Sequence, residues 1–225
     1  MLTLYGNQVS GHSYKVALFL ELAGAAYRYE EIDIFVPREP AFVRLSRHNE
    51  VPVLVHNGQP IVQSNAILIW LAGHFGRFGG QTDAACTTIH EWLFWEMSRL
   101  SLGVANLRFM RRFERDTPET LIAHYAKRCF AALDELEAAL QGRAFLSGDD
   151  LTIADIACCG YLFWFSEVGI DRQAYHNIDA WLSRIAARPG WQAPEHLLGK
   201  SRERERGRRL DPSEPCESAF ERHLA

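Results

Sequence analysis

Residues 50–67, with the sequence EVPVLVHNGQPIVQSNAI, decide the fold of the first part of the chain. Two short apolar runs, VPVLV and PIV, flank Asn57-Gly58, and Asn-Gly is the dipeptide most typical of a two-residue hairpin turn. Pro52 stands at the entrance of the first run, where a strand tolerates the loss of a backbone N–H. This stretch therefore predicts two strands joined by a tight turn, and residues 64–75 predict the helix that follows.

The residues before this hairpin predict a strand, a helix and a second strand. The N-terminal residues MLTLY alternate apolar and polar side chains, and residues 13–23, SYKVALFLELA, are apolar enough for a buried helix that Gly24 would end. Residues 27–32 alternate with a period of two, whereas residues 36–50 give no clear element. Residues 1–76 are therefore expected to form a compact α+β domain of type βαβ-ββα, with four strands in one sheet.

The chain beyond residue 76 predicts helices only. Residues 77–85, RFGGQTDAA, have the composition of a linker, and residues 86–195 are expected to form an all-α helical bundle. The predicted helices cover residues 84–113, residues 117–141, a very apolar segment from residue 153 onward, and residues 179–188. Thr117-Pro118 is expected to supply a cap and a first-turn proline, and Thr152 with Asp155 matches a capping box.

Residues 196–225 change character and form a charge-dense segment with few core residues. Its arginines alternate with glutamates, which cancel much of the positive charge and argue against nucleic-acid binding. We predict a solvated or disordered tail.

Composition places the chain among ordinary globular proteins. It has 225 residues, 48% of them hydrophobic and 23% charged, and a formal net charge of −4, which favours neither nucleic acid nor an acidic membrane as a partner. No charge-free apolar run is long enough to span a bilayer, and the first residues lack a signal-peptide pattern. Five cysteines show no metal-ligand spacing, so we expect no metal site and a reducing cytoplasm.

The run Val51-Pro52-Val53-Leu54, together with Gln63-Ser64-Asn65-Ala66-Ile67, resembles the signature of the glutathione transferase family. The resemblance covers residues 1–75, and the capping box at 152–155 recurs in the second domain of that family. It implies a thioredoxin-like first domain that binds glutathione as a co-substrate, an all-helical second domain and a homodimer. In the family the proline is cis, and the residue before it, here Val51, presents its backbone to the cysteinyl part of glutathione.

Ser64 would hold an anion on physical grounds as well. A serine at a helix N-terminus offers a hydroxyl and a backbone N–H, and the helix dipole favours negative charge there. The γ-glutamyl carboxylate of glutathione is such an anion, so Gln63 and Ser64 are predicted to bind it. The alternative is that Ser64 only caps the helix.

The loop of residues 7–13, NQVSGHS, joins the first strand to the first helix and resembles the loop of serine-type glutathione transferases. The match places the stabilising serine at Ser10, with Gly11 relaxing the turn. The thiol of glutathione is a poor nucleophile until it is ionised, and a hydroxyl with helix N-terminal amides would favour the thiolate. We expect Ser13 to cap the helix, which would leave Ser10 available to the sulfur.

Two other residues compete with Ser10 or assist it. Tyr5 lies at the strand end, where tyrosine-type members of the family carry their catalytic hydroxyl. His12 lies where related sequences have cysteine or asparagine, and it would donate to the thiolate or to a substrate carbonyl, or it is a surface residue without a role. The loop has no cysteine, which argues against glutaredoxin-like exchange through a protein thiol.

Further contacts to glutathione are expected just before the hairpin. By the resemblance, a basic or amide side chain near residues 47–49 holds the glycyl carboxylate, and His48 is the best match, followed by Arg47. A solvated loop is the alternative reading of the same residues.

The second substrate, a small electrophile, is expected above the sulfur and against the helical domain. Aromatic and charged side chains on the predicted helix 84–113 are candidates for that wall, but aromatic residues at helical spacing are more often core or dimer interface. Arg108, Arg111 and Arg112 either attract an anionic electrophile or form a solvated face. We assign no catalytic role to these residues.

The sequence thus predicts a glutathione transferase that conjugates the glutathione thiolate to small electrophiles, as in detoxification, with Ser10 lowering the thiol pKa. Glutathione-dependent isomerases, peroxidases and dehalogenases of the same fold are alternatives. A binding module that keeps the fold without catalysis is a third possibility, because one fold hosts many functions.

Overall fold

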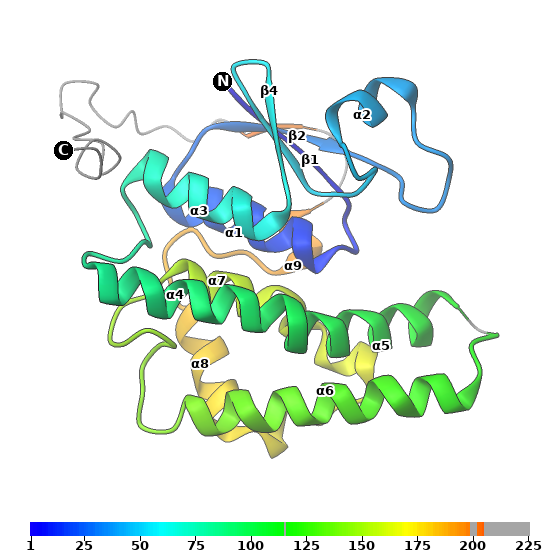
Figure 1. Cartoon of the computed structure of the whole chain (residues 1–225), viewed down its shortest axis with the longest axis vertical. Helices are drawn as coiled ribbons and strands as arrows, with labels where there is room; N and C mark the ends of the chain where they lie inside the picture. Colours follow the sequence, from blue (N-terminus) through cyan, green and yellow to red (C-terminus); the bar gives the residue numbers. More distant parts are fainter. Residues whose placement is uncertain (115, 199–201, 205–225) are drawn as a thin grey trace. The chain divides into compact units, whose positions relative to one another are not determined.

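The computed structural model describes residues 1–114, 116–198 and 202–204 (Figure 1). These residues form two compact units. The first unit comprises residues 1–79 together with the described residues from 189 onward, and the second comprises residues 80–188. The segment that follows residue 188, expected in the helical bundle, therefore belongs to the first unit.

The first unit is built on a mixed sheet with the strand order β4-β3-β1-β2-β5. Its strands are β1 (Leu2–Gly6), β2 (Tyr27–Glu31), β3 (Val53–His56), β4 (Gln59–Val62) and β5 (Arg202–Arg204). The strand β1 pairs parallel with β2 and antiparallel with β3, and β3 pairs antiparallel with β4. Asn57 and Gly58 both have positive φ, at 49° and 80°, so the predicted tight turn between β3 and β4 is confirmed.

Two helices cover one face of this sheet. The helix α1 (Gly11–Ala23) contacts β1 and lies beside α3 (Ser64–Phe75), which contacts β3 and β4 (Figure 1). Every residue of α1 except His12 is buried, and Gly24 ends the helix at a φ of 69°, as predicted. The short helix α2 (Pro40–Leu45) lies in the connection for which the sequence predicted no element.

The predicted tail is wrong in its first residues. Residues 194–197 form the short helix α9 (Pro194–Leu197), which packs on α1, and Leu197 and Leu198 are buried. The strand β5 then pairs antiparallel with β2, so the sheet has five strands where four were predicted. The prediction followed the many charged residues of this segment and missed the two leucines. Burying their apolar side chains stabilises the packed conformation of these residues. The remaining residues of the predicted tail, 199–201 and 205–225, lie outside the described residues.

The second unit is helical. Its helices are α4 (Asp83–Trp95), α5 (Ser101–Phe113), α6 (Glu119–Ala139), α7 (Ile153–Cys158) and α8 (His176–Ala186), with 3₁₀ segments at Cys159–Val168 and Arg172–Ala174. Residues 96–100 form a π-helical turn that joins α4 to α5, so the predicted helix 84–113 is continuous. The helix α5 packs along α6 (Figure 1). None of the helices in the described ranges is long and apolar enough to cross a bilayer.

Two predicted helix starts have different outcomes. The Thr152–Asp155 capping box is present, with the Asp155 carboxylate accepting from the Thr152 N–H at 2.9 Å. The predicted Thr117 cap of α6 is wrong, because the Thr117 hydroxyl donates to the Glu114 carbonyl at 2.9 Å. Pro118 takes the capping position of α6 without a side-chain hydrogen bond, since it has no polar side chain.

Candidate active site

Strand register brings three predicted site segments to one edge of the sheet. Tyr5 of β1 pairs with Val53 of β3, and Val53 pairs with Val62 of β4. The loop after β1, the residues before β3 and the residues after β4 therefore all leave the sheet at this edge. These segments carry Ser10, Val51-Pro52 and Gln63-Ser64.

Ser10 is the N-cap of α1, and the prediction that Ser13 takes this position is wrong. The helix begins at Gly11, and the Ser10 hydroxyl oxygen accepts a hydrogen bond from the Ser13 N–H at 3.1 Å. Ser10 is 7% exposed, at the positive end of a 13-residue helix. An N–H that points at the oxygen leaves the hydroxyl proton available to donate elsewhere. The capping bond is thus compatible with donation to a thiolate.

Asn7, which the sequence analysis did not single out, organises the loop before Ser10. Its side-chain oxygen accepts from the Val9 N–H at 3.0 Å, and its amide nitrogen donates to the Ile32 carbonyl at 2.8 Å. Its backbone N–H donates to the Ser13 hydroxyl at 3.1 Å, and its carbonyl accepts from the Ser10 N–H at 3.0 Å. An asparagine beside a helix start is a signal for such a turn.

The two competitors of Ser10 lie in different surroundings. Tyr5 points away from the sheet face that α1 covers, because the buried residues of β1 alternate with it, and its ring centroid lies 6.1 Å from that of Phe42 in α2. His12 is half-buried in the first turn of α1, two residues after Ser10. Ser10 and His12 thus lie at the start of α1, whereas Tyr5 lies on the other face of the sheet, beside α2.

The Val51–Pro52 peptide bond is cis, and Pro52 is buried immediately before β3. Gln63 has a φ of 69°, in the region that residues other than glycine seldom adopt. Its side-chain nitrogen donates to the Glu50 carboxylate at 3.2 Å, which links the segment before β3 to the segment after β4. A non-glycine residue held at positive φ is often part of a functional site.

Ser64 is the first residue of α3 and is buried. Its neighbour Asn65 accepts a hydrogen bond at 2.8 Å from the ammonium group of Lys15, a fully buried residue of α1. This bond ties the start of α3 to α1, the helix that begins beside Ser10. Lys15 is not among the site residues predicted from the sequence.

His48 and Arg47 are both exposed in the turn between α2 and β3. The turn is shaped by Ser46, whose buried hydroxyl accepts from the Glu50 N–H and donates to the Glu50 carbonyl, both at 2.9 Å. Asn49 follows with a φ of 56°. An ordered turn thus presents two exposed basic side chains. Their role in binding the glycyl carboxylate stays a prediction.

The basic cluster of the second unit is engaged in internal contacts. The Arg108 guanidinium is buried, lies 2.6 Å from the Glu167 carboxylate and stacks 4.3 Å from the ring centroid of Trp164. Desolvation lowers the pKa of Arg108, and the Glu167 charge opposes that change. Arg111 donates to the Val168 carbonyl, and Arg112 lies 3.4 Å from Glu167. The sequence predicted either a site for an anionic electrophile or a solvated face, and neither describes Arg108, which is buried and paired within the second unit.

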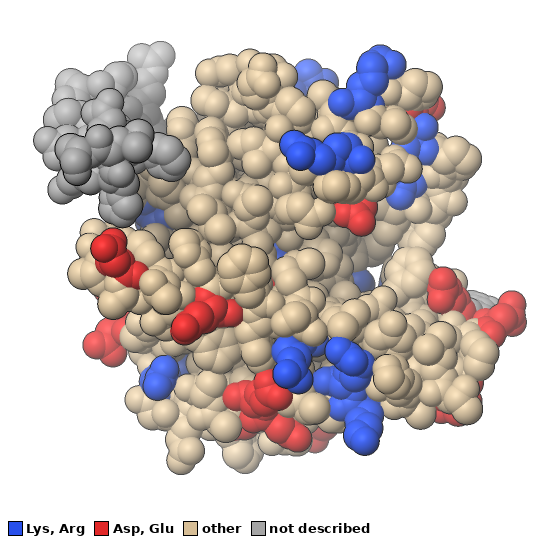
Figure 2. All heavy atoms as spheres, in the orientation of Figure 1, with Lys and Arg blue, Asp and Glu red and all other residues tan. Residues whose placement is uncertain are grey.

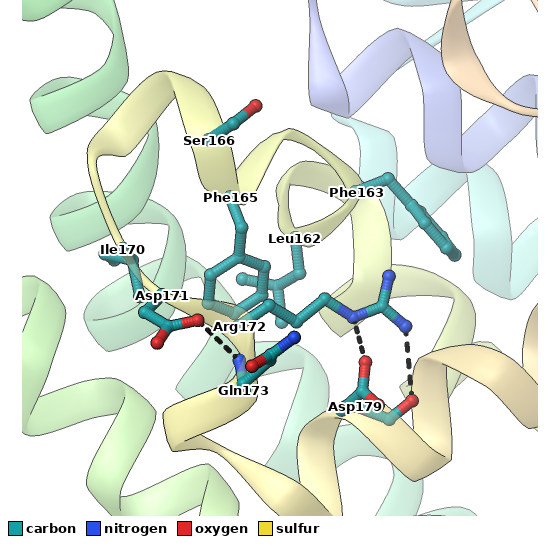
Figure 3. A pocket seen from close by; sticks show the side chains of 9 residues that line it. All are labelled: Leu162, Phe163, Phe165, Ser166, Ile170, Asp171, Arg172, Gln173 and Asp179. Carbon is teal, nitrogen blue, oxygen red and sulfur yellow. Dashed lines mark hydrogen bonds and ion pairs between the residues drawn. The ribbon is translucent and has the colours of Figure 1, made fainter.

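An open pocket of about 660 Å³ lies in the second unit (Figure 3). Its wall is formed by Leu162, Phe163, Phe165, Ser166, Ile170, Asp171, Arg172, Gln173 and Asp179. Figure 3 shows the Arg172 guanidinium directed at Asp179, with which it forms an ion pair, while the Asp171 carboxylate accepts from the Gln173 N–H at 2.9 Å. None of the site residues predicted from the sequence lines this pocket.

Neither the surface charge nor the metal-ligating side chains of the described residues indicate a second candidate site. Figure 2 shows basic and acidic side chains on the same face, several of them next to one another. Within the part of the chain that the structure describes, no group of three histidine, cysteine or acidic side chains is placed to hold a metal ion.

Two profiles of one protein family match this chain. The profile described as "Glutathione S-transferase, N-terminal domain" matches residues 1–73, and the one described as "Glutathione S-transferase, C-terminal domain" matches residues 99–189. Together they cover more than half of the chain, in the two parts that form the sheet unit and the helical unit.

Individual proteins agree with the profiles. The disulfide-bond oxidoreductase YfcG of Escherichia coli (strain K12) is 29% identical over 190 residues, which cover 79% of this chain and 87% of YfcG. A possible glutathione S-transferase from Rhodopseudomonas palustris has a TM-score of 0.81 at 31% identity, covering 87% of this chain and 90% of that chain. A family member from Pseudomonas fluorescens Pf-5, solved with two glutathione bound, has a TM-score of 0.74 at 26% identity, covering 84% and 89%.

Proposed function

Because this chain belongs to the glutathione transferase family, we propose that it binds glutathione in its first unit and ionises the thiol at Ser10 for attack on a small electrophile. The observation that carries this proposal is the position of Ser10. Its hydroxyl caps α1 at the sheet edge where the segments of Pro52 and Ser64 also end.

The three parts of the tripeptide correspond to three groups of residues. Ser64, with Gln63, would hold the γ-glutamyl carboxylate through the hydroxyl and the first amides of α3, where the helix dipole favours an anion. Val51 would pair its backbone N–H and C=O with the cysteinyl residue, beside the cis Pro52. His48, followed by Arg47, would hold the glycyl carboxylate.

The thiolate would be stabilised at the start of α1. A thiol has an ordinary pKa of about 8.5, and helix N-termini and hydrogen-bond donors lower that value. Ser10 would donate its hydroxyl proton to the sulfur while its oxygen accepts from the Ser13 N–H, and this acceptance polarises the O–H bond. His12, in the same turn, would assist Ser10 as a second donor.

Conjugation would then form one bond and break one bond. The sulfur lone pair of the thiolate attacks an electrophilic carbon, and the leaving group departs with the electron pair of its bond. Addition to an activated double bond is the same step with a later proton uptake on carbon. Either reaction needs only the bound thiolate and a second substrate held near it.

Three variants of Ser10 separate its capping role from its role at the sulfur. Ser10→Ala removes both roles, Ser10→Asp keeps a good N-cap without a donor, and Ser10→Thr keeps both. We expect kcat with a generic aryl halide to fall about 100-fold in the first two variants, the typical cost of losing one such donor. The pKa of the bound thiol should rise in both. Wild-type values in Ser10→Asp would exclude Ser10 from the mechanism.

Disulfide reduction is a second candidate, favoured by the similarity to YfcG. The cysteines described in the structure all lie in the second unit, so a reaction at Ser10 would rely on the glutathione thiol itself. One glutathione thiolate would attack a disulfide and release one thiolate, forming a mixed disulfide. A second glutathione would attack this bond, giving oxidised glutathione and the second thiol. Assays with an aryl halide and with hydroxyethyl disulfide would distinguish conjugation from reduction.

We also propose that the protein is a cytoplasmic homodimer. Phe94 is 77% exposed on α4, and Met97 in the following turn is exposed as well, so these two apolar side chains are available for contact with a second copy of the chain. Phe94→Glu should shift the sedimentation coefficient from dimer to monomer if this face is the interface. A wild-type monomer would exclude the dimer.

A further inference from the structure

Glu31 ends β2 at the edge of the sheet that carries Ser10. Gly6, the last residue of β1, pairs with Glu31 in parallel register, and the carboxyl ends of parallel strands leave a sheet at the same edge. Tyr29 precedes Glu31 by two residues and is buried on the sheet face that α1 covers, since a Cβ at Gly6 would lie 3.0 Å from both the Tyr29 ring and Ser13 of α1. Alternation along the strand therefore places the Glu31 carboxylate on that face, beside the loop between β1 and α1.

Both oxygens of this carboxylate are engaged. The Oε1 atom accepts from the Asn7 side-chain amide and from the Gln8 backbone N–H, each at 3.0 Å, and the Oε2 atom accepts from the Tyr29 hydroxyl at 2.5 Å. Desolvation raises the pKa of Glu31, and the bonds from Tyr29 and Gln8 oppose this rise. The carboxylate is thus a half-buried acceptor shared between β2 and two consecutive loop residues.

The loop residues that Glu31 holds are connected directly to Ser10. The Ser10 N–H donates to the Asn7 carbonyl at 3.0 Å, and the Asn7 N–H donates to the Ser13 hydroxyl at 3.1 Å. Ser13 in turn donates its N–H to the Ser10 hydroxyl oxygen. These bonds fix both the backbone and the side chain of Ser10 relative to Asn7. The position of Asn7 depends on its two side-chain donations to the end of β2, one to Glu31 and one to the Ile32 carbonyl.

We infer that Glu31 is a positioning residue for Ser10: it anchors Asn7 and Gln8 so that the Ser10 hydroxyl is aimed at the bound thiol. This inference rests on the proposed function of Ser10. Glu31 has no part in the reaction itself, since its carboxylate is occupied by three donors and acts through the loop. A misplacement of a reacting group by about 1 Å can cost about 100-fold in rate, so a loosened loop should be visible in catalysis.

Three variants test the inference. Glu31→Ala removes the acceptor, whereas Glu31→Gln keeps an oxygen for Asn7 and Gln8 and offers an N–H₂ group to the Tyr29 oxygen. Glu30→Ala, one residue earlier on β2, is the matched control because the Glu30 carboxylate pairs with Arg28 on the strand. The measurements are amide hydrogen exchange of residues 8–13, the pKa of the bound glutathione thiol from its ultraviolet absorbance, and kcat/KM.

In Glu31→Ala we expect faster exchange in the loop, a raised thiol pKa and a loss of kcat/KM on the order of 10- to 100-fold. Glu31→Gln should recover most of that loss, and Glu30→Ala should match the wild type. Unchanged exchange in Glu31→Ala, or faster exchange with an unchanged thiol pKa, would overturn the inference. A wild-type protein that leaves the thiol pKa at its free value would instead refute the proposed function, and hydrogen exchange would then decide whether Glu31 fixes the loop.

Discussion

The Asp155 carboxylate is the polar centre of the second unit, and its removal should destabilise that unit strongly. Asp155 is fully buried and accepts four hydrogen bonds. Its Oδ1 atom accepts from the Leu146 N–H and from the Trp181 indole, each at 2.9 Å. Its Oδ2 atom accepts from the Thr152 N–H at 2.9 Å and from the Thr152 hydroxyl at 3.1 Å.

The magnitude follows from the donors that a substitution would leave without an acceptor. Asp155→Ala leaves two backbone N–H groups and one indole N–H without an acceptor. Each buried donor without a partner costs about 1–3 kcal/mol of stability. Burial raises the pKa of Asp155, because desolvation disfavours the charged carboxylate. Removing the carboxylate relieves this desolvation, which offsets part of the cost. We expect a net loss of about 4 kcal/mol. Asp155→Asn keeps one oxygen for Leu146 and Trp181 but turns an N–H₂ group toward the Thr152 N–H, which should cost about 1–2 kcal/mol.

Urea unfolding monitored by tryptophan fluorescence measures both differences. A loss of 4 kcal/mol corresponds to a decrease in Tm of roughly 8–16 °C for a protein of this size, which thermal unfolding by circular dichroism can check. If Asp155→Ala and Asp155→Asn lose the same free energy of unfolding, the donors left without an acceptor do not determine the loss of stability, and the reasoning is refuted.

Two further predictions concern stability: the packing at Gly103 in the second unit and the pH dependence due to His74 in the first. A Cβ at Gly103 in α5 would lie 2.8 Å from the Cys129 backbone in α6, so Gly103→Ala should lose about 1–3 kcal/mol of stability in urea unfolding. The control Gly73→Ala, in α3 with no atom near its Cβ position, should instead gain about 0.5–1 kcal/mol; equal effects would contradict the packing argument. Desolvation, and then the charge of nearby His56, lowers the pKa of His74, so the unfolded chain binds a proton more readily than the folded chain does. The free energy of unfolding should therefore fall as the pH drops below about 6.5, and His74→Gln should flatten this dependence relative to the control His124→Gln.

Local patterns allowed the sequence to predict the elements that depend on neighbouring residues. The hairpin at Asn57-Gly58 and the capping box at Thr152 are each complete within a few residues, so their geometry follows from side chains that are close in the sequence. Gly24 is predictable for the same reason, because its positive φ ends α1 without help from distant residues.

Contacts between distant residues explain what the sequence could not predict. Leu197 and Leu198 look like isolated apolar residues beside a charged segment, and only packing in the first unit shows that they are core. Arg108 looks like one of three solvated arginines, but Glu167 and Trp164, more than fifty residues away, hold it in the core. Nothing in the sequence distinguishes Glu31 and Asn7 from other polar residues, because it is the parallel pairing of β1 and β2 that brings them together.

The error at Ser13 sharpens the argument for Ser10. The sequence predicted that Ser13 caps the helix and that Ser10 is thereby left available to the sulfur. In the structure Ser10 caps α1, yet capping uses only an oxygen lone pair, and the hydroxyl keeps one proton to donate. The cap also fixes Ser10 at the positive end of the helix, where a thiolate is favoured most. Capping and thiol activation therefore require the same position, and the variant Ser10→Asp is the one that separates them.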